Sequence, residues 1–170
     1  MKTIHINEQF KEDWNRVLNH IANLFYEDSV IQFTKDGANM SISFEHGIAD
    51  DYTISTAAKL IVDGQEFTSS YSIGYATEGT EKEQSIRMKR ALSHVMLDVL
   101  EQYTGMTQQW GILTGVRPTK LYHKFRKEGL YEEQIFEKLK TDFRLSDLKI
   151  NLLKEIVARQ LHVIPDLDEL

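Results

Sequence analysis

The spacing of hydrophobic residues in the first part of the chain alternates between the period of a helix and that of a strand. Apolar residues recur every three or four positions over 8–26, which predicts an amphipathic helix capped by Asn7. Shorter runs rich in β-formers predict five strands, over 3–6, 30–34, 40–44, 52–62 and 67–75. Asp36-Gly37 and Asp63-Gly64 are turn signals, so we expect two hairpins.

Helical signals dominate after the last strand. Thr80 and Glu83 match a capping box, and Gly105 is placed to end the helix that begins there. Three shorter helices are predicted, over 118–127, 131–143 and 146–161. The order of elements indicates an α+β fold. We expect a mainly antiparallel sheet with two packed helices over 1–109, followed by a turn and a small C-terminal helical unit over 110–170.

The turn between these parts, 110–120, has an unusual sequence. Two glycines give it backbone freedom, and Pro118 is suited to the first turn of a helix. Arg117 and Lys120 flank that helix start, where an anion would be held by charge and by free amides. The residues nominated as substrate-binding or interdomain candidates are Trp110, Thr114, Gly115, Arg117 and Lys120.

A structural interpretation of the same turn stays open. In it, Trp110 is a buried hydrophobic plug at the junction of the two parts, and Trp110→Ala destabilises the protein by about 3 kcal/mol. Arg117 then bonds carbonyl groups nearby instead of a ligand. Glycine and proline serve as turn residues in many loops, so the pattern alone does not decide between the two interpretations.

Positive charge gathers on two predicted helices. One set lies on the long helix and the other follows Pro118, and they comprise Arg87, Lys89, Arg90 and His94, then Arg117, Lys120, His123, Lys124, Arg126 and Lys127. Guanidinium groups of this kind are suited to clamping carboxylates. Alternatively, both sets are solvated helix faces interleaved with acidic residues.

Composition excludes several classes of function. The 170 residues carry a formal net charge of −6, which argues against a dedicated nucleic-acid binder. No apolar run approaches the roughly 20 residues of a membrane span, so we expect a cytoplasmic protein. The six histidines lack metal-site spacing, and no nucleophile elbow or phosphate loop is present. We therefore nominate neither catalytic residues nor metal ligands.

The string WGILTGVRPTKLYHK, at 110–124, carries a resemblance to a known family. Together with the preceding helix and the charged helices that follow, it resembles the N-terminal region of HemZ-type proteins, which are oxygen-independent coproporphyrinogen III oxidase-like radical SAM proteins. The likeness is densest over 111–124. It implies an accessory domain of a coproporphyrinogen dehydrogenase-like oxidoreductase of porphyrin and heme biosynthesis, one that positions the substrate or packs against another domain.

The family holds its iron–sulfur cluster through a Cys-x-x-x-Cys-x-x-Cys motif, and this chain has no cysteine. The resemblance thus implies that the 4Fe-4S cluster and S-adenosylmethionine belong to a C-terminal radical SAM domain absent from this chain. That domain would be the main partner, with a tetrapyrrole substrate as the other. We do not expect the chain alone to be catalytic. The alternative is a stand-alone binding module for an anionic small molecule or a protein.

Overall fold

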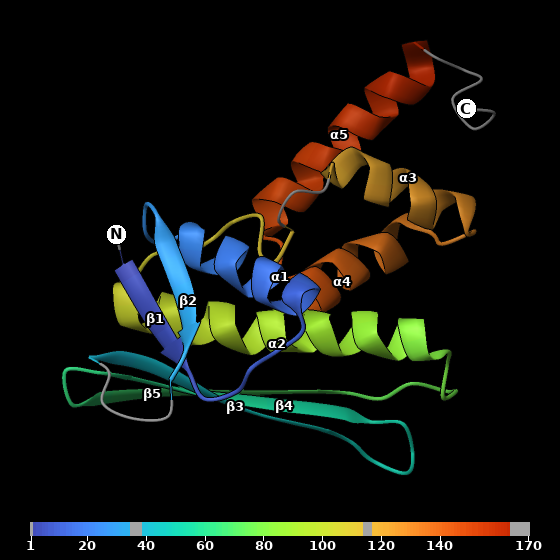
Figure 1. Cartoon of the computed structure of the whole chain (residues 1–170). Helices are drawn as coiled ribbons and strands as arrows, with labels where there is room; N and C mark the ends of the chain where they lie inside the picture. The colour runs from blue at the N-terminus through green and yellow to red at the C-terminus, as the bar shows by residue number, and fades with distance from the viewer. Residues whose placement is uncertain (1, 35–38, 114–116, 164–170) are drawn as a thin grey trace. The chain divides into compact units, whose positions relative to one another are not determined.

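The computed structural model describes residues 2–34, 39–113 and 117–163. Two compact units make up the chain, Met1–Thr107 and Gln108–Leu170, and both are drawn in Figure 1. The first unit contains all the described strands and two helices. In chain order its elements are β1 (Lys2–Ile6), α1 (Glu12–Asn23), β2 (Ser29–Phe33), β3 (Met40–Ile48), β4 (Ile54–Val62), β5 (Gln65–Ile73) and α2 (Glu81–Thr104).

These strands form one mixed sheet in the order β2-β1-β3-β4-β5. β1 runs parallel to both of its neighbours, whereas β3, β4 and β5 are joined by long antiparallel ladders. Helices α1 and α2 lie on the same side of the sheet (Figure 1). The expected α+β class is confirmed, and the helical part that follows completes it.

The hairpin expected at Asp36-Gly37 is wrong. β1 lies between β2 and β3, so these two consecutive strands do not pair. Gln32 and Ser41 both stand opposite His5, which means that β3 begins at the level where β2 ends. β2 and β3 therefore run in the same direction on either side of β1. The turn residues 35–38 themselves lie outside the described part of the chain.

The start of α1 also differs from the expectation. The helix begins at Glu12, and Asn7 does not cap it. The Asn7 side chain instead accepts a hydrogen bond from the Phe44 amide at 2.9 Å and donates to the Phe44 carbonyl at 3.5 Å. A carboxamide carries both a donor and an acceptor, so it can pair with the backbone as a neighbouring strand would. Asn7 thus attaches the end of β1 to β3.

The second expected hairpin and the expected ends of the long helix are confirmed. Asp63 and Gly64, with φ of 49° and 80°, form the tight turn that joins β4 to β5. Thr80 and Glu83 form the expected capping box, and Gly105 ends α2 with φ of 71°. Alternate residues of the sheet point toward the helices and build the core, which includes Ile4, Ile42, Leu60, Leu18, Ile21, Leu92, Val95 and Met96.

The described part of the second unit contains three helices, α3 (Pro118–Lys127), α4 (Glu132–Phe143) and α5 (Asp147–Val163), as the sequence predicted. Each helix contacts the other two. Apolar residues at helical spacing form the core of the unit, and they are Tyr122, Phe125, Ile135, Leu139, Phe143, Leu145, Ile150, Leu153 and Val157.

The turn over 108–113 is attached to the corner between α4 and α5. The Ile112 amide donates to the Phe143 carbonyl at 3.0 Å, and the Ser146 amide donates to the Gln109 carbonyl at 2.9 Å. Gly111, with φ of 57°, lies between these two bonds. A Cβ placed there would overlap the carbonyl oxygens of Phe143 and Arg144. Only glycine fits, because both the backbone angle and the close approach exclude a side chain.

We therefore expect Gly111→Ala to destabilise the helical unit by about 3 kcal/mol or more, since it adds a steric overlap with rigid backbone to an unfavourable φ. Gly129→Ala is the matched control: it also has positive φ, at 88°, but faces open space, so it should cost only about 1–2 kcal/mol. Urea unfolding of both variants in a Trp14→Phe background, followed by Trp110 fluorescence, measures the difference. Equal losses would show that the close approach at Gly111 is not required.

Candidate functional site

Helix α3 has an apolar face and a basic face. Tyr122 and Phe125 are buried in the core of the helical unit. On the other side, cationic side chains recur at intervals of three and four residues, so they form one row along the helix. They are Arg117, Lys120, Lys124 and Lys127, and all four are exposed. The rise of 1.5 Å per residue places the first and last of these Cα atoms about 15 Å apart.

This row lines a groove of about 610 Å³, which we call the α3 groove. Its lining residues are Arg117, Thr119, Lys120, His123, Lys124, Lys127, Glu128 and Gln160. Gln160 is contributed by α5, and the rest belong to α3 or its ends. Four cations face a single carboxylate, that of Glu128, so the groove has an excess of three positive charges. Arg117 and Lys120, both nominated from the sequence, lie in it.

Described neighbours do not neutralise the four cations. Within the part of the chain that the structure describes, none of them forms an ion pair. The basic residues of α2 differ in this respect. Arg87 lies 3.9 Å from Glu83 and stacks over the Tyr75 ring, while Lys89 lies 3.8 Å from Asp13. The α2 set therefore has structural partners, whereas Arg117, Lys120, Lys124 and Lys127 remain available to a ligand.

His123 is held in one orientation at the side of the groove. Its Nε2 lies 2.8 Å from the Gln160 Oε1, and its Nδ1 lies 3.5 Å from Arg126 Nη2. Because an amide oxygen only accepts and a guanidinium only donates, Nε2 carries the proton and Nδ1 accepts. This pairing connects α3 to α5 and leaves the amide NH₂ of Gln160 for other contacts.

The start of α3 has fewer free backbone amides for an anion than the sequence suggested. Pro118 has no amide hydrogen, and the amides of Lys120 and Leu121 already donate to the Arg117 carbonyl at 3.1 and 3.4 Å. Arg117 occupies the N-cap position but its side chain does not cap the helix. Anion binding here would accordingly depend on the side-chain charges along the groove more than on the helix terminus.

Trp110 is the other nominated residue that the structure describes. Thr114 and Gly115 lie outside the described residues. Trp110 is half-buried, and its expected place at a junction of the two parts stays a prediction. Its ring lies 5.1 Å from the Lys149 ammonium, which covers one side of it. Trp110 thus packs within the helical unit, beside the corner that Gly111 approaches, and it does not line the groove.

Gln160 is the groove residue that the sequence analysis missed. It lies near the end of α5, 37 positions from His123, and nothing in the spacing along the chain indicates that the two meet. Among the described residues, no group of three His, Asp or Glu side chains is arranged to hold a metal ion. None of the helices in the described part is long and apolar enough to cross a membrane.

Comparison with known proteins confirms the resemblance seen in the sequence. The chain is 40% identical over 155 residues to the oxygen-independent coproporphyrinogen-III oxidase-like protein HemZ of Bacillus subtilis (strain 168). The match covers 90% of this chain but only 30% of HemZ, so the chain spans less than a third of that relative and matches an N-terminal region of it. No family model matches the chain.

One solved structure, protein VC0702 from Vibrio cholerae, is weakly similar. It shares 12% sequence identity with this chain at a TM-score of 0.35, over 98% of both chains. A similarity of this size carries no argument about fold or function.

The half-burial of Trp110 lowers the expected effect of its removal. We expect Trp110→Ala to destabilise the helical unit by about 1–2 kcal/mol, less than for a core aromatic, through lost apolar contact and the lost cation–π contact with Lys149. Urea unfolding monitored by far-UV circular dichroism measures this. In a Trp14→Phe background the emission of Trp110 should be intermediate between that of a core and a solvated indole. An unchanged unfolding midpoint would contradict the packing against Lys149.

Proposed function

We propose that this chain, which matches an N-terminal region of HemZ, is an accessory domain of a coproporphyrinogen III dehydrogenase-like oxidoreductase in porphyrin and heme biosynthesis. The identity of 40% over 90% of the chain is the observation that carries this proposal. The radical SAM domain, with its 4Fe-4S cluster and S-adenosylmethionine, would lie in the rest of the longer protein. We propose a cytoplasmic location for the whole.

Within that protein, we propose that the α3 groove contacts either the carboxylates of the substrate or an acidic surface of the radical SAM domain. The groove's four cations without ion pairs among the described residues support this role. Exposed charges are screened by salt and bind carboxylates weakly on their own. A second domain that excludes water from the groove would strengthen the same contacts, because charge-assisted hydrogen bonds gain strength on desolvation.

A stand-alone module that binds an anionic small molecule or a protein is the second candidate. The same excess of three positive charges supports it, since every described lining residue of the groove belongs to the helical unit. Reading the natural gene beyond the codon for Leu170 distinguishes the two candidates. A continuation that encodes Cys-x-x-x-Cys-x-x-Cys supports the accessory domain, and a stop codon at that point supports the module.

The isolated chain is expected to assemble no iron–sulfur cluster, because it contains no cysteine to supply thiolate ligands. Anaerobic reconstitution with iron and sulfide, followed by gel filtration, tests this. The purified chain should show neither charge-transfer absorption nor stoichiometric iron. A stable cluster on the chain alone would contradict the proposal that the cluster belongs to the radical SAM domain.

The role of the groove is tested on a full-length protein that contains this chain. Arg117→Ala should leave the melting temperature within about 2 °C, because the side chain is exposed and caps nothing. Porphyrinogen turnover should fall at least about ten-fold, since a charged hydrogen bond contributes about 1.5–3 kcal/mol. Lys82→Ala, which removes an exposed cation from α2 outside the groove, is the matched control and should leave both quantities unchanged.

Two results would speak against the groove as a functional surface. In the first, Arg117→Ala lowers the melting temperature markedly while porphyrinogen turnover per folded molecule stays normal, which assigns Arg117 a structural role. In the second, Arg117→Ala and Lys82→Ala reduce turnover equally, which reflects net charge alone.

A further inference from the structure

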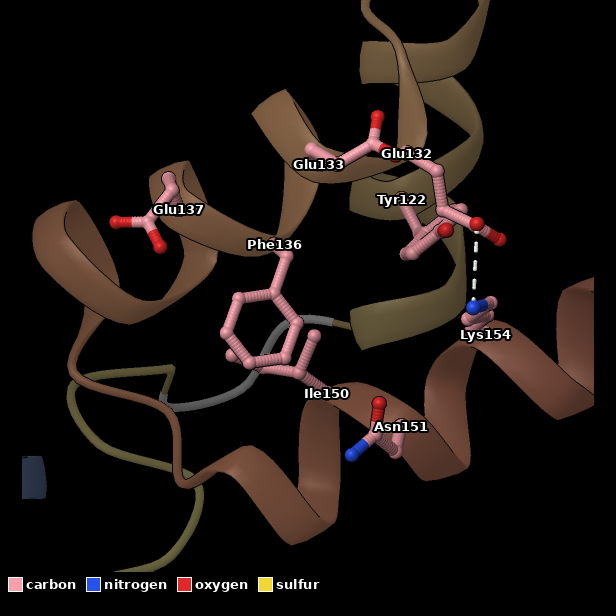
Figure 2. A pocket seen from close by; sticks show the side chains of 8 residues that line it. All are labelled: Tyr122, Glu132, Glu133, Phe136, Glu137, Ile150, Asn151 and Lys154. Carbon is pink, nitrogen blue, oxygen red and sulfur yellow. Dashed lines mark ion pairs between the residues drawn. The ribbon is translucent and has the colours of Figure 1, made fainter.

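A second pocket of the helical unit lies between α3, α4 and α5 and shares no lining residue with the α3 groove. We call it the Tyr122 pocket. It has a volume of about 280 Å³ and is lined by Tyr122, Glu132, Glu133, Phe136, Glu137, Ile150, Asn151 and Lys154 (Figure 2). This volume is just below the usual range for small-molecule sites, so it suits only a small ligand.

The hydroxyl of Tyr122 is the most unusual group in the pocket. The residue is only 5% exposed, yet its hydroxyl forms no hydrogen bond with any other residue that the structure describes. Burial raises the pKa of Tyr122, the nearby Glu132 carboxylate raises it further, and Lys154 and Arg126 oppose the shift. The hydroxyl therefore keeps its proton at neutral pH. The hydroxyl oxygen itself is not fully enclosed, so water or a ligand in the pocket can bond to it.

The charge of the pocket is negative. Glu132 is paired with Lys154 at 3.1 Å, and Figure 2 shows this pair beside Tyr122. Glu133 and Glu137 form no ion pair with a described residue. Three carboxylates against one ammonium leave an excess of two negative charges. These carboxylates do not converge as metal ligands do, since the described residues hold no acidic group of that geometry.

The other wall of the pocket is apolar. Ile150 is 1% exposed, Phe136 is half-buried, and Figure 2 shows the two side chains next to each other. The Lys140 ammonium lies 5.8 Å from the centre of the Phe136 ring, so this ring already attracts a cation on one side. A ligand suited to these surroundings combines positive charge with a flat or branched hydrocarbon body.

We infer that the Tyr122 pocket binds a small organic amine in its charged form. Its ammonium would lie against Glu133 and Glu137, its hydrocarbon body would pack on Phe136 and Ile150, and a polar group of the ligand would bond the Tyr122 hydroxyl. The excess of negative charge selects against carboxylates, which are the expected ligands of the α3 groove. The two sites of this unit thus take ligands of opposite charge.

Tyramine is the probe, because it carries an ammonium, an aromatic ring and a phenolic hydroxyl. Titration of the 170-residue chain, with ¹³C-labelled isoleucine and tyrosine observed by NMR, should give saturable shifts at Ile150 and Tyr122. 4-Hydroxyphenylacetate replaces the ammonium by a carboxylate on the same ring and should bind at least about ten-fold more weakly. Equal affinity for the two compounds, or shifts that do not saturate, would overturn the inference.

Variants assign the binding to this pocket. The double change Glu133→Gln and Glu137→Gln should weaken tyramine binding by about ten-fold. The matched control, Glu128→Gln with Glu155→Gln, also removes two exposed carboxylates of the helical unit but none from the pocket, and it should bind tyramine as the parent does. Equal weakening in both double variants would mean that tyramine responds to net charge alone, and the pocket would not be its site.

Tyr122→Phe tests the hydroxyl. Because this hydroxyl has no partner among the described residues, its removal should leave the melting temperature unchanged or slightly raised. Affinity for tyramine should fall several-fold, while affinity for phenethylamine, which lacks the phenolic group, should change little. An equal loss for both amines would contradict the proposed contact.

Discussion

The close approach of the Gly111 backbone to the corner between α4 and α5 is the constraint on which the helical unit depends. A side chain at position 111 would overlap the carbonyls of Phe143 and Arg144, so the turn can lie there only as glycine. Two backbone hydrogen bonds then fix the corner. The corner sets the direction in which α5 leaves α4, and α5 contributes residues to both sites of the unit, Gln160 to one and Lys154 to the other.

Helix α3 separates two surfaces of opposite charge. Its basic row lines the α3 groove, while Tyr122, on its buried side, reaches a pocket surrounded by carboxylates. The net charge of −6 averages over these local differences and describes neither surface. Electrostatic attraction acts over distances of about 8–10 Å at physiological salt, so a ligand at either surface would respond to the local excess of charge there. This is why a chain with an acidic composition can present a surface suited to carboxylates.

The sheet illustrates where local signals are sufficient and where they are not. The Asp63-Gly64 turn joins two strands that pair directly, so the local sequence fully specified that hairpin. The similar signal at Asp36-Gly37 was misleading, because β1 occupies the place between β2 and β3. β1 comes from the beginning of the chain, so no residue near Asp36-Gly37 indicates that it inserts between the two strands. Asn7 was misassigned for the same reason, since its partner Phe44 lies 37 positions away.

The sequence by itself determined the helices and strands, the α+β class, the capping of α2 and the presence of cations at Arg117 and Lys120. These features depend on periodicity and on residues a few positions apart, which the chain displays directly. The resemblance to HemZ could also be read from 110–124. Tertiary structure decided the order of the strands, the half-burial of Trp110, the groove completed by Gln160 and the pocket around Tyr122. Each of these depends on contacts between helices or strands distant in sequence, whose packing no local pattern specifies.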